Sequence, residues 1–413
     1  MRSGKERMIT AIKDGCPDDI PNGIYWTTLS VSHGHFWDEI QGDTPWWINY
    51  TLGTRNDPDF SKRLKVEENL HDAIDIDWIW TRGLCPKREW RKNQAIISTA
   101  KGDWSVNVAP SPWGEGNLYR ARVKLEKPPQ DGYHFPSMDT TRNIINMAEL
   151  IQSNEDVEYY VDVKKAEELI DDGQLDWFEA LVKRFRDEYF FLLYVATPFT
   201  QLDHLLGSQN VLTMIVKNPK LIHRLLDTFA NKNIEKMKAC AKIYGDREGI
   251  GSHNWEWYTD QILSPKQWET FGKPYIGKVV KAAKQLGIKY MQTVSGAGMQ
   301  WEEGLKHMLS LKPDMFHLEE EMKGVKTDIA WQADFLKNEG HQNDVALTGN
   351  INTLRLIHEA PLDEVAKEVK RQITIGREYG KFFMMTGAVI AEETSLERVQ
   401  AYCRLVRKYG RMK

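Results

Sequence analysis

The segment SHNWEWYTDQ, residues 252–261, holds the densest group of side chains that could do chemistry. In an extended chain, His253, Trp255 and Trp257 fall on one side and Glu256 on the other. A histidine and a carboxylate beside two indoles could bind an aromatic group and move a proton. The alternative is a loop with a buried aromatic anchor and solvated polar residues. Its place at the end of a predicted strand favours a functional site.

The segment FHLEEE brings His317 and Glu319 to one side of a strand, two residues apart. This spacing suits a pair of metal ligands or an acid and a base. Glu320 and Glu321 are more typical of the start of a solvated helix, where negative charge suits the positive end of the helix dipole. We therefore keep Glu319 as a candidate and expect the next two carboxylates in solvent.

Other polar clusters carry weaker signals. His33 and His35 in VSHGHFW have a spacing that can chelate a metal, but such pairs are common by chance; His35 is kept as a substrate-binding candidate. Asp72, Asp75 and Asp77 in HDAIDIDWIW could place a carboxylate in a pocket or equally line a solvated edge. The Gly-rich turn in QTVSGAG lacks the lysine of a phosphate loop, and no GxGxxG follows a predicted strand, so a nucleotide site is not expected.

These side chains must be positioned by strands that alternate with helices. Residues 189–196 form a continuous apolar run, which is typical of a strand buried on both faces. Helix signals include Asn218-Pro219 before a long helix, a capping box at Ser264-Pro265-x-Gln267 before another, and a capping box at Thr394-x-x-Glu397 before the last helix. Further strands are expected at residues 22–27, 249–255, 288–294, 314–318, 345–348 and 382–385. Successive strand-helix units predict a parallel sheet. Periodicity alone does not determine whether this sheet stays open or closes into a barrel.

In a parallel α/β barrel the active site lies where the strands end. Applied to the predicted strands, this rule nominates residues at several strand ends as pocket residues. They are Trp26, Thr27, His253, Asn254, Trp255, Glu256, Trp257, Thr293, Ser295, His317, Glu319, Asn350 and Thr386.

Residues 28–140 have a different character. Tryptophan is concentrated near the N-terminus, which indicates either a small core filled by large side chains or an aromatic-lined pocket for a flat or cationic ligand. We expect one domain over residues 1–413, with residues 28–140 as a β-rich insertion or lid. Nine of the 15 tryptophans lie in the first 113 residues: Trp26, Trp37, Trp46, Trp47, Trp78, Trp80, Trp90, Trp104 and Trp113.

Composition excludes several classes of protein. The 413 residues carry 55 basic and 59 acidic side chains, a net charge of −4 without a basic block, so nucleic acid is not an expected partner. The longest apolar run is far shorter than the roughly 20 residues of a membrane span, so no membrane association is expected. The charged N-terminus does not resemble a secretory signal, and four scattered cysteines fit a reducing compartment. We therefore expect a cytoplasmic protein.

Several segments, in order, resemble the uroporphyrinogen decarboxylase superfamily. GKERMITAIKDGCPDDIP is similar to its opening, and ATPFTQLDHLLG followed by NPKLIHRLLD to its strand-and-helix segment. ILSPKQWETFGKPYIGKVVKAAKQLG, LTGNIN and MMTGAVIAEETSLERVQAY resemble its later motifs. The resemblance covers the first thirty residues and most of the chain from Val157 onward, and it implies a (β/α)₈ barrel.

The resemblance also shows where this chain departs from known members. Decarboxylases of the superfamily have an arginine-bearing loop after the first strand, which grips substrate carboxylates, whereas this chain reads WTTLSVSHGHFW there. Decarboxylation of a tetra-anionic porphyrinogen is therefore disfavoured. Thiol-methylating members bind zinc through HxC and a later cysteine; the matching residues are Thr293, Ser295 and Ala388, none a competent ligand. Zinc would need other ligands, such as His317 and Glu319.

The resemblance implies the branch that removes a methyl group from a methoxylated aromatic and passes it to the corrinoid (cobalamin) of a partner protein. A methylated amine is an alternative donor. Alternatives for the whole protein are the second-step methyltransferase to tetrahydrofolate or a thiol, and a ligand-binding barrel without catalysis. The oligomeric state stays open, a homodimer included. Catalytic candidates are His253, Glu256 and Glu319; substrate-binding candidates are Trp26, His35, Trp255, Trp257, Thr293, Ser295, His317, Asn350 and Thr386.

Overall fold

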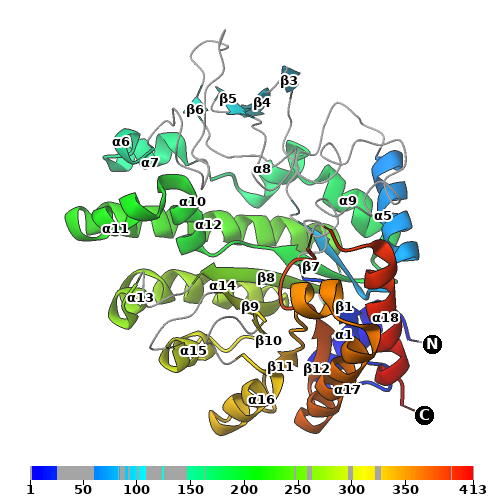
Figure 1. Cartoon of the computed structure of the whole chain (residues 1–413). Coiled ribbons are helices and arrows are strands. Elements are labelled where there is room, and N and C mark those ends of the chain that lie inside the picture. Colours follow the sequence, from blue (N-terminus) through cyan, green and yellow to red (C-terminus); the bar gives the residue numbers. More distant parts are fainter. Residues whose placement is uncertain are drawn as a thin grey trace.

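Eight parallel strands form a nearly closed ring with helices between them in the computed structural model, a (β/α)₈ barrel (Figure 1). The strand order is β1-β12-β11-β10-β9-β8-β7-β2, which confirms the predicted fold. The structure describes residues 2–25, 60–81, 83, 89–91, 94–99, 102–107, 123–124, 147–161, 163–245, 248–257, 263–295, 301–320, 327–391 and 393–412, without the side chains of residues 62–63, 89–124, 147, 255–257, 295 and 301. The barrel strands are β1 (Asn22–Gly23), β2 (Trp78–Thr81), β7 (Phe190–Tyr194), β8 (Ile250–Trp257), β9 (Lys289–Ser295), β10 (Met315–Leu318), β11 (Ala346–Thr348) and β12 (Phe382–Met385).

The helices surround this ring. The helices predicted after Asn218-Pro219 and Ser264-Pro265 begin at Pro219 and Pro265, and the segment after β11 is a π-helix, η1. The described helices are α1 (Gly4–Lys13), α5 (Ser61–Ala73), α6 (Met147–Leu150), α7 (Asn154–Tyr160), α8 (Ala166–Asp171), α9 (Asp176–Phe185), α10 (Pro198–Leu206), α11 (Ser208–Lys217), α12 (Pro219–Tyr244), α13 (Pro265–Phe271), α14 (Lys273–Gln285), α15 (Trp301–Leu309), α16 (Ile329–Asn338), η1 (Thr353–Glu359), α17 (Leu362–Tyr379) and α18 (Leu396–Gly410). Among the described helices, none is long and apolar enough to cross a membrane.

Helix capping follows the predicted signals with one exception. The Asn218 side chain accepts a hydrogen bond from Leu221 N, and Ser264 forms the predicted capping box with Gln267. The capping box predicted at Thr394 is wrong, because α18 begins after Ser395, which makes no side-chain cap bond. The Thr394 hydroxyl instead lies 3.2 Å from His358 Nδ1, so tertiary contact outweighs the local signal.

Alternation along each strand divides the core into two layers. On β7, Phe191 and Leu193 pack with the helices, whereas Phe190, Leu192 and Tyr194 belong to a cluster inside the ring. Helix α1 contributes Met8 and Ile12 to that inner cluster and so closes one end of the lumen. The other members are Tyr25, Trp78, Trp80, Met291, Met315, Ala346, Phe383 and Met385.

Strand β2 lies within residues 28–140, where we expected only an insertion. It pairs in parallel with β7, with Trp78 opposite Phe190 and Thr81 opposite Leu193, and therefore belongs to the barrel. A separate antiparallel sheet in the same range contains β3 (Glu89–Arg91), β4 (Gln94–Thr99), β5 (Gly102–Asn107) and β6 (Val123–Lys124). The boundaries of the insertion and its role as a lid stay predictions.

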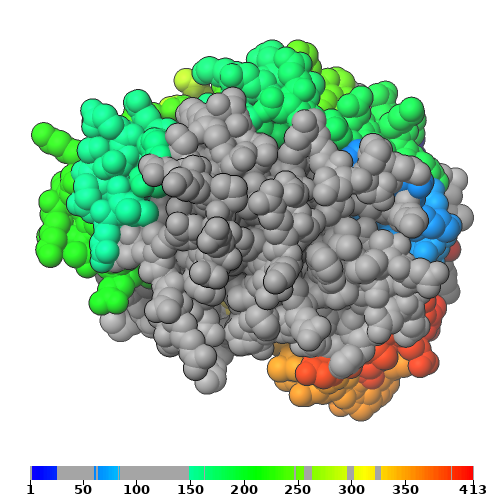
Figure 2. Space-filling model, turned by 90° about the horizontal axis from the view of Figure 1, so that it is seen from above, coloured from blue at the N-terminus to red at the C-terminus, as the bar shows by residue number. Residues whose placement is uncertain are grey.

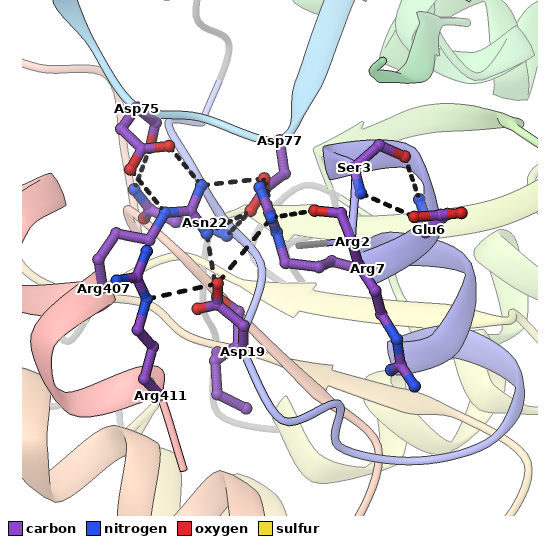
Figure 3. Close-up of polar contacts among 12 residues, drawn as sticks. Arg2, Ser3, Glu6, Arg7, Asp19, Asn22, Asp75, Asp77, Arg407 and Arg411 are labelled. Carbon is purple, nitrogen blue, oxygen red and sulfur yellow. Dashed lines mark hydrogen bonds and ion pairs between the residues drawn. The ribbon is translucent and has the colours of Figure 1, made fainter. Parts of the chain in front are cut away.

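The two ends of the eight-stranded sheet, β1 and β2, meet at Asp77. The Asp77 backbone N–H donates to Asn22 O at 2.8 Å, and Asn22 N–H donates to the Asp77 carboxylate at 2.7 Å. Arg407 of α18 contacts both oxygens of Asp77 at 2.9 Å, and Arg7 of α1 also pairs with this carboxylate (Figure 3). Asp77 is fully buried, so this network of charges closes the barrel at the N-terminal ends of its strands.

This arrangement corrects both interpretations for Asp77, whereas Asp72 and Asp75 are exposed, as the interpretation of a solvated edge predicted. Asp77 neither faces a pocket at the carboxyl ends nor lies in solvent; it is a buried structural ion. Asp75 pairs with Arg407 through two hydrogen bonds of 2.6 and 2.8 Å. Burial alone would raise the pKa of Asp75, but the hydrogen bonds and charge of Arg407 outweigh it and lower that pKa.

We expect Asp77→Asn to lower the free energy of unfolding by about 3 kcal/mol, because it removes the fully buried counter-charge that Arg7 and Arg407 share. Urea denaturation followed by circular dichroism measures this change. The control is Asp187→Asn, whose side chain is 88% exposed and should alter stability by less than about 0.5 kcal/mol. Equal effects of the two substitutions would contradict a closing role for Asp77.

Candidate functional site

Three polar side chains lie close together on the lumen wall, on the neighbouring strands β8, β9 and β10. They are His253, Thr293 and His317, each no more than 1% exposed. The register places His317 opposite Thr293, and His253 opposite Met291 two residues earlier on the same strand. The structure therefore brings together three residues that the sequence predicted for the site.

The tautomer of His253 is fixed by Trp80 of β2. The Trp80 indole N–H donates to His253 Nδ1 at 3.0 Å, and an indole nitrogen can only donate. His253 Nδ1 therefore carries the lone pair, and the proton of the neutral ring lies on Nε2. His253 Nε2 is buried and has no hydrogen-bond partner in the described structure.

The tautomer of His317 is fixed in a similar way by Thr386. His317 Nε2 lies 3.3 Å from the Thr386 carbonyl oxygen, which can only accept, so the ring proton lies on Nε2. The buried Nδ1 then carries a lone pair, and the described residues provide no hydrogen-bond donor for it. The two imidazoles consequently differ in what they offer: His253 an unused donor, His317 an unused acceptor.

Burial keeps both imidazoles uncharged. Desolvation, with a smaller contribution from the nearby His317, lowers the pKa of His253 to about 3. Desolvation also lowers the pKa of His317 to about 3, although its hydrogen bond to Thr386 opposes this shift. At neutral pH these residues therefore act as neutral hydrogen-bonding groups and cannot serve as imidazolium acids.

Tyr25, directly after β1, holds the two imidazoles from the other side of the lumen. Its ring stacks on His317 with centroids 5.0 Å apart and meets His253 edge-on at 5.3 Å. Burial raises the pKa of Tyr25 well above its usual value, and the charges of Glu319 and Tyr194 act in the same direction. Tyr25 therefore remains a neutral phenol, and Glu319 lies within electrostatic reach of it.

Asn350 and Thr386 have their side chains engaged within the protein. Asn350 Nδ2 donates to the carbonyl oxygens of Thr327 at 2.6 Å and Glu319 at 3.4 Å. The Thr386 hydroxyl accepts from Tyr25 N and donates to Ala388 O. Both residues thus position the strand ends, and their direct contact with a substrate stays a prediction.

Glu320 differs from the sequence-based expectation of a solvated helix start. Its carboxylate is half-buried and accepts hydrogen bonds from the backbone N–H and the hydroxyl of Thr353, the first residue of η1. Burial raises the pKa of Glu320 against these hydrogen bonds. A Cβ on Gly387 would lie 2.6 Å from Glu320, so glycine is needed where the segment after β12 crosses this residue.

Several predicted site residues fall outside what the structure describes. Trp26 and His35 are not among the described residues. For Trp255, Glu256, Trp257 and Ser295 only the backbone is described. Figure 2 shows the face that is seen from above in the view of Figure 1. Described residues, coloured green, blue and orange to red, lie around the rim of this face. The backbone pairs Trp255 with Thr293 and Trp257 with Ser295, which continues the alternation that places His253 in the lumen. Their roles, and that of Glu256, stay predictions.

The described donor set does not fit a zinc ion. Thr293 stands where zinc-binding members have histidine, and His253 Nε2 carries a proton because Trp80 occupies the other nitrogen. The described residues contain no group of three or more His, Cys, Asp or Glu side chains that could hold a metal. His317 and Glu319 alone would provide two ligands at most.

Three site residues were missed by the sequence reasoning: Tyr25, Trp80 and Tyr194. The sequence nominated Trp26 because the first strand was expected to run to residue 27, whereas β1 contains only two residues. Trp80 was assigned to the insertion, although the alternation of Trp78 and Trp80 in WIWT could have indicated a strand. Tyr194 was predicted only as part of a buried strand.

Comparison with known families shows which family the chain belongs to. A family model described as uroporphyrinogen decarboxylase (URO-D) matches residues 138–409, well over half of the chain. The chain belongs to the uroporphyrinogen decarboxylase family. This confirms the resemblance seen in the sequence motifs at the level of the superfamily.

The individual proteins that match this chain are only distantly similar to it in sequence. A uroporphyrinogen decarboxylase from Thermodesulfovibrio yellowstonii is 23% identical over 224 residues, which are 52% of this chain and 59% of that protein. The match therefore spans little more than half of the relative's length. A solved structure described as a methyltransferase from Methanosarcina mazei shares the fold with a TM-score of 0.63 at 14% identity, and 99% of each chain is covered.

The neutral imidazoles predict a dependence of stability on pH. A histidine whose folded pKa is lowered binds fewer protons when folded, so the free energy of unfolding falls as the pH drops from 6.5 towards 3. Each histidine should contribute a slope of up to about 1.4 kcal/mol per pH unit in this range.

Urea denaturation at a series of pH values measures this slope. His253→Gln or His317→Gln should flatten it, whereas Thr293→Val, a change in the same lumen without a titrating group, should leave it as in the wild type. An unchanged slope in both histidine variants would show that these imidazoles are not held neutral.

Proposed function

We propose that this protein is the substrate-specific methyltransferase of a corrinoid-dependent demethylation system. It transfers a methyl group from a methoxylated aromatic to the cobalt of a corrinoid carried by a partner protein. The observation that supports this most strongly is the uncharged, ring-lined site formed by Tyr25, Trp80, His253 and His317. A flat, neutral substrate suits such a site.

The charge of the site argues against decarboxylation of a porphyrinogen. That substrate has four carboxylates, and its recognition calls for cationic side chains, typically arginine. The described side chains of the lumen cluster are apolar or aromatic, and the histidines beside them are neutral. The sequence from residue 26 to 37 also contains no arginine or lysine.

The proposed reaction breaks the bond between the methyl carbon and the aryl oxygen. A reduced corrinoid would supply the nucleophile that takes the methyl group. The electron pair of the broken bond stays on the oxygen, which becomes a phenolate and then takes up one proton. The protein must therefore hold the methyl group in line for attack and lower the energy of the developing negative charge.

The described residues suit these tasks. His253 Nε2–H is a fixed donor that can hydrogen-bond to the aryl oxygen as its charge develops. Because the pKa of His253 is about 3, the proton itself must come from elsewhere. Glu319 is our candidate among the described side chains, and Glu256 stays a candidate from the sequence alone. Glu319, half-buried beyond the end of β10, is near Tyr25.

Mixing the protein with a reduced corrinoid protein and 2-methoxyphenol tests this function. The expected result is a shift of the cobalt absorbance to the methylated form with release of one diphenol per methyl group. Methyl loss from a premethylated corrinoid protein to tetrahydrofolate or a thiol would indicate the second-step enzyme instead. Binding without turnover would indicate a non-catalytic barrel, and transfer only from methylated amines would change the donor class.

We expect Glu256→Gln and His253→Ala to reduce the rate of cobalt methylation by about 100-fold or more, because each removes a group that assists the leaving oxygen. The control is Glu364→Gln, an exposed carboxylate at the start of α17, which should retain the wild-type rate. Circular dichroism verifies that the variants are folded. Rates near wild type in both site variants would contradict these roles.

A further inference from the structure

The lumen site contains three buried polar atoms that the described structure leaves without partners. They are His253 Nε2, His317 Nδ1 and Thr293 Oγ1, on three neighbouring strands. Buried polar groups in folded proteins are nearly always paired, so such atoms indicate a bound partner that satisfies them. Both imidazoles also contact the single ring of Tyr25, so these atoms share one stretch of the lumen wall.

The hydrogen-bonding character of these atoms is fixed by the residues behind them. Trp80 makes His253 Nε2 a donor, and the Thr386 carbonyl makes His317 Nδ1 an acceptor. The Thr293 hydroxyl can do either. A partner that satisfies this set must accept one hydrogen bond and donate another, which is what a single neutral hydroxyl group does.

We propose that His253, Thr293 and His317 form a subsite for one neutral hydroxyl group, and that phenols are the class of ligand it takes. The inference extends the proposed function, since a phenol is the product of the demethylation. The hydroxyl oxygen accepts from His253 Nε2–H, and its proton is donated to His317 Nδ1. Tyr25 and Tyr194, which contact the imidazoles, offer aromatic rings beside the phenol.

Other oxygen groups satisfy the subsite less well. A methyl ether accepts from His253 but has no proton for His317, which leaves a buried acceptor unpaired. A carboxylate has the same defect and adds a charge that the neutral lumen does not balance. The subsite therefore favours the phenol over the ether from which it forms, by about tenfold in affinity.

Calorimetric titration of the full-length protein at pH 7 tests this preference with three probes of similar size: phenol, methoxybenzene and benzoate. Phenol should bind about tenfold more tightly than methoxybenzene, and benzoate more weakly than either. Equal affinities for phenol and methoxybenzene would overturn the proposal, and would indicate that the subsite holds only a buried water.

The variant His317→Phe removes the acceptor but keeps an aromatic ring to stack on Tyr25. It should lose the preference for phenol over methoxybenzene. The matched control His341→Phe, on a partly exposed histidine after α16, should keep the preference. If His317→Phe does not fold, Thr293→Val offers a near-isosteric second test and should reduce the preference by less; a preference unchanged in every folded site variant would contradict the subsite.

These measurements separate the subsite from the proposed function. Preferential binding of phenol without any methylation of cobalt would support the subsite and contradict the methyltransferase. Cobalt methylation without a phenol preference would do the reverse.

Discussion

Closure of the strand ring at Asp77 is the constraint on which the rest of the structure depends. Strands β1 and β2 are the two ends of the sheet, and a fully buried carboxylate joins them through Asn22 and two arginines from α1 and α18 (Figure 3). Close packing supports the same junction, because a Cβ on Gly23 would lie 1.9 Å from the Trp78 ring. The first, second and last elements of the barrel thus meet at its N-terminal end.

This junction determines the chemistry at the opposite end of the lumen. Tyr25 follows β1 and Trp80 lies in β2, so closing the ring brings both side chains against His253. Trp80 then selects the tautomer of His253, and Tyr25 excludes water from one face of His317. The result is a pair of neutral imidazoles with opposite hydrogen-bonding roles, built on rigid strands rather than on loops.

Local signals made much of the barrel predictable, whereas its closure was not. The apolar run of β7 and the Asn218-Pro219 start of α12 depend on neighbouring residues only, and both were predicted from sequence. Asp77 pairs with a residue 330 positions away, so neither its burial nor its role could be inferred from HDAIDIDWIW. Likewise, His253 and His317 were recognised by their strand ends, but their protonation depends on Trp80 and Thr386, which only the tertiary structure brings near.

The central claim is that His253 and His317 are neutral, each with its proton on Nε2. Nitrogen-15 NMR of the histidine-labelled protein at pH 6 tests it directly, with His253→Gln and His317→Gln used to assign the two signals. We predict that both rings show a protonated Nε2 and an unprotonated Nδ1 at this pH. Signals of an imidazolium, or of a proton on Nδ1, from either residue would contradict the account.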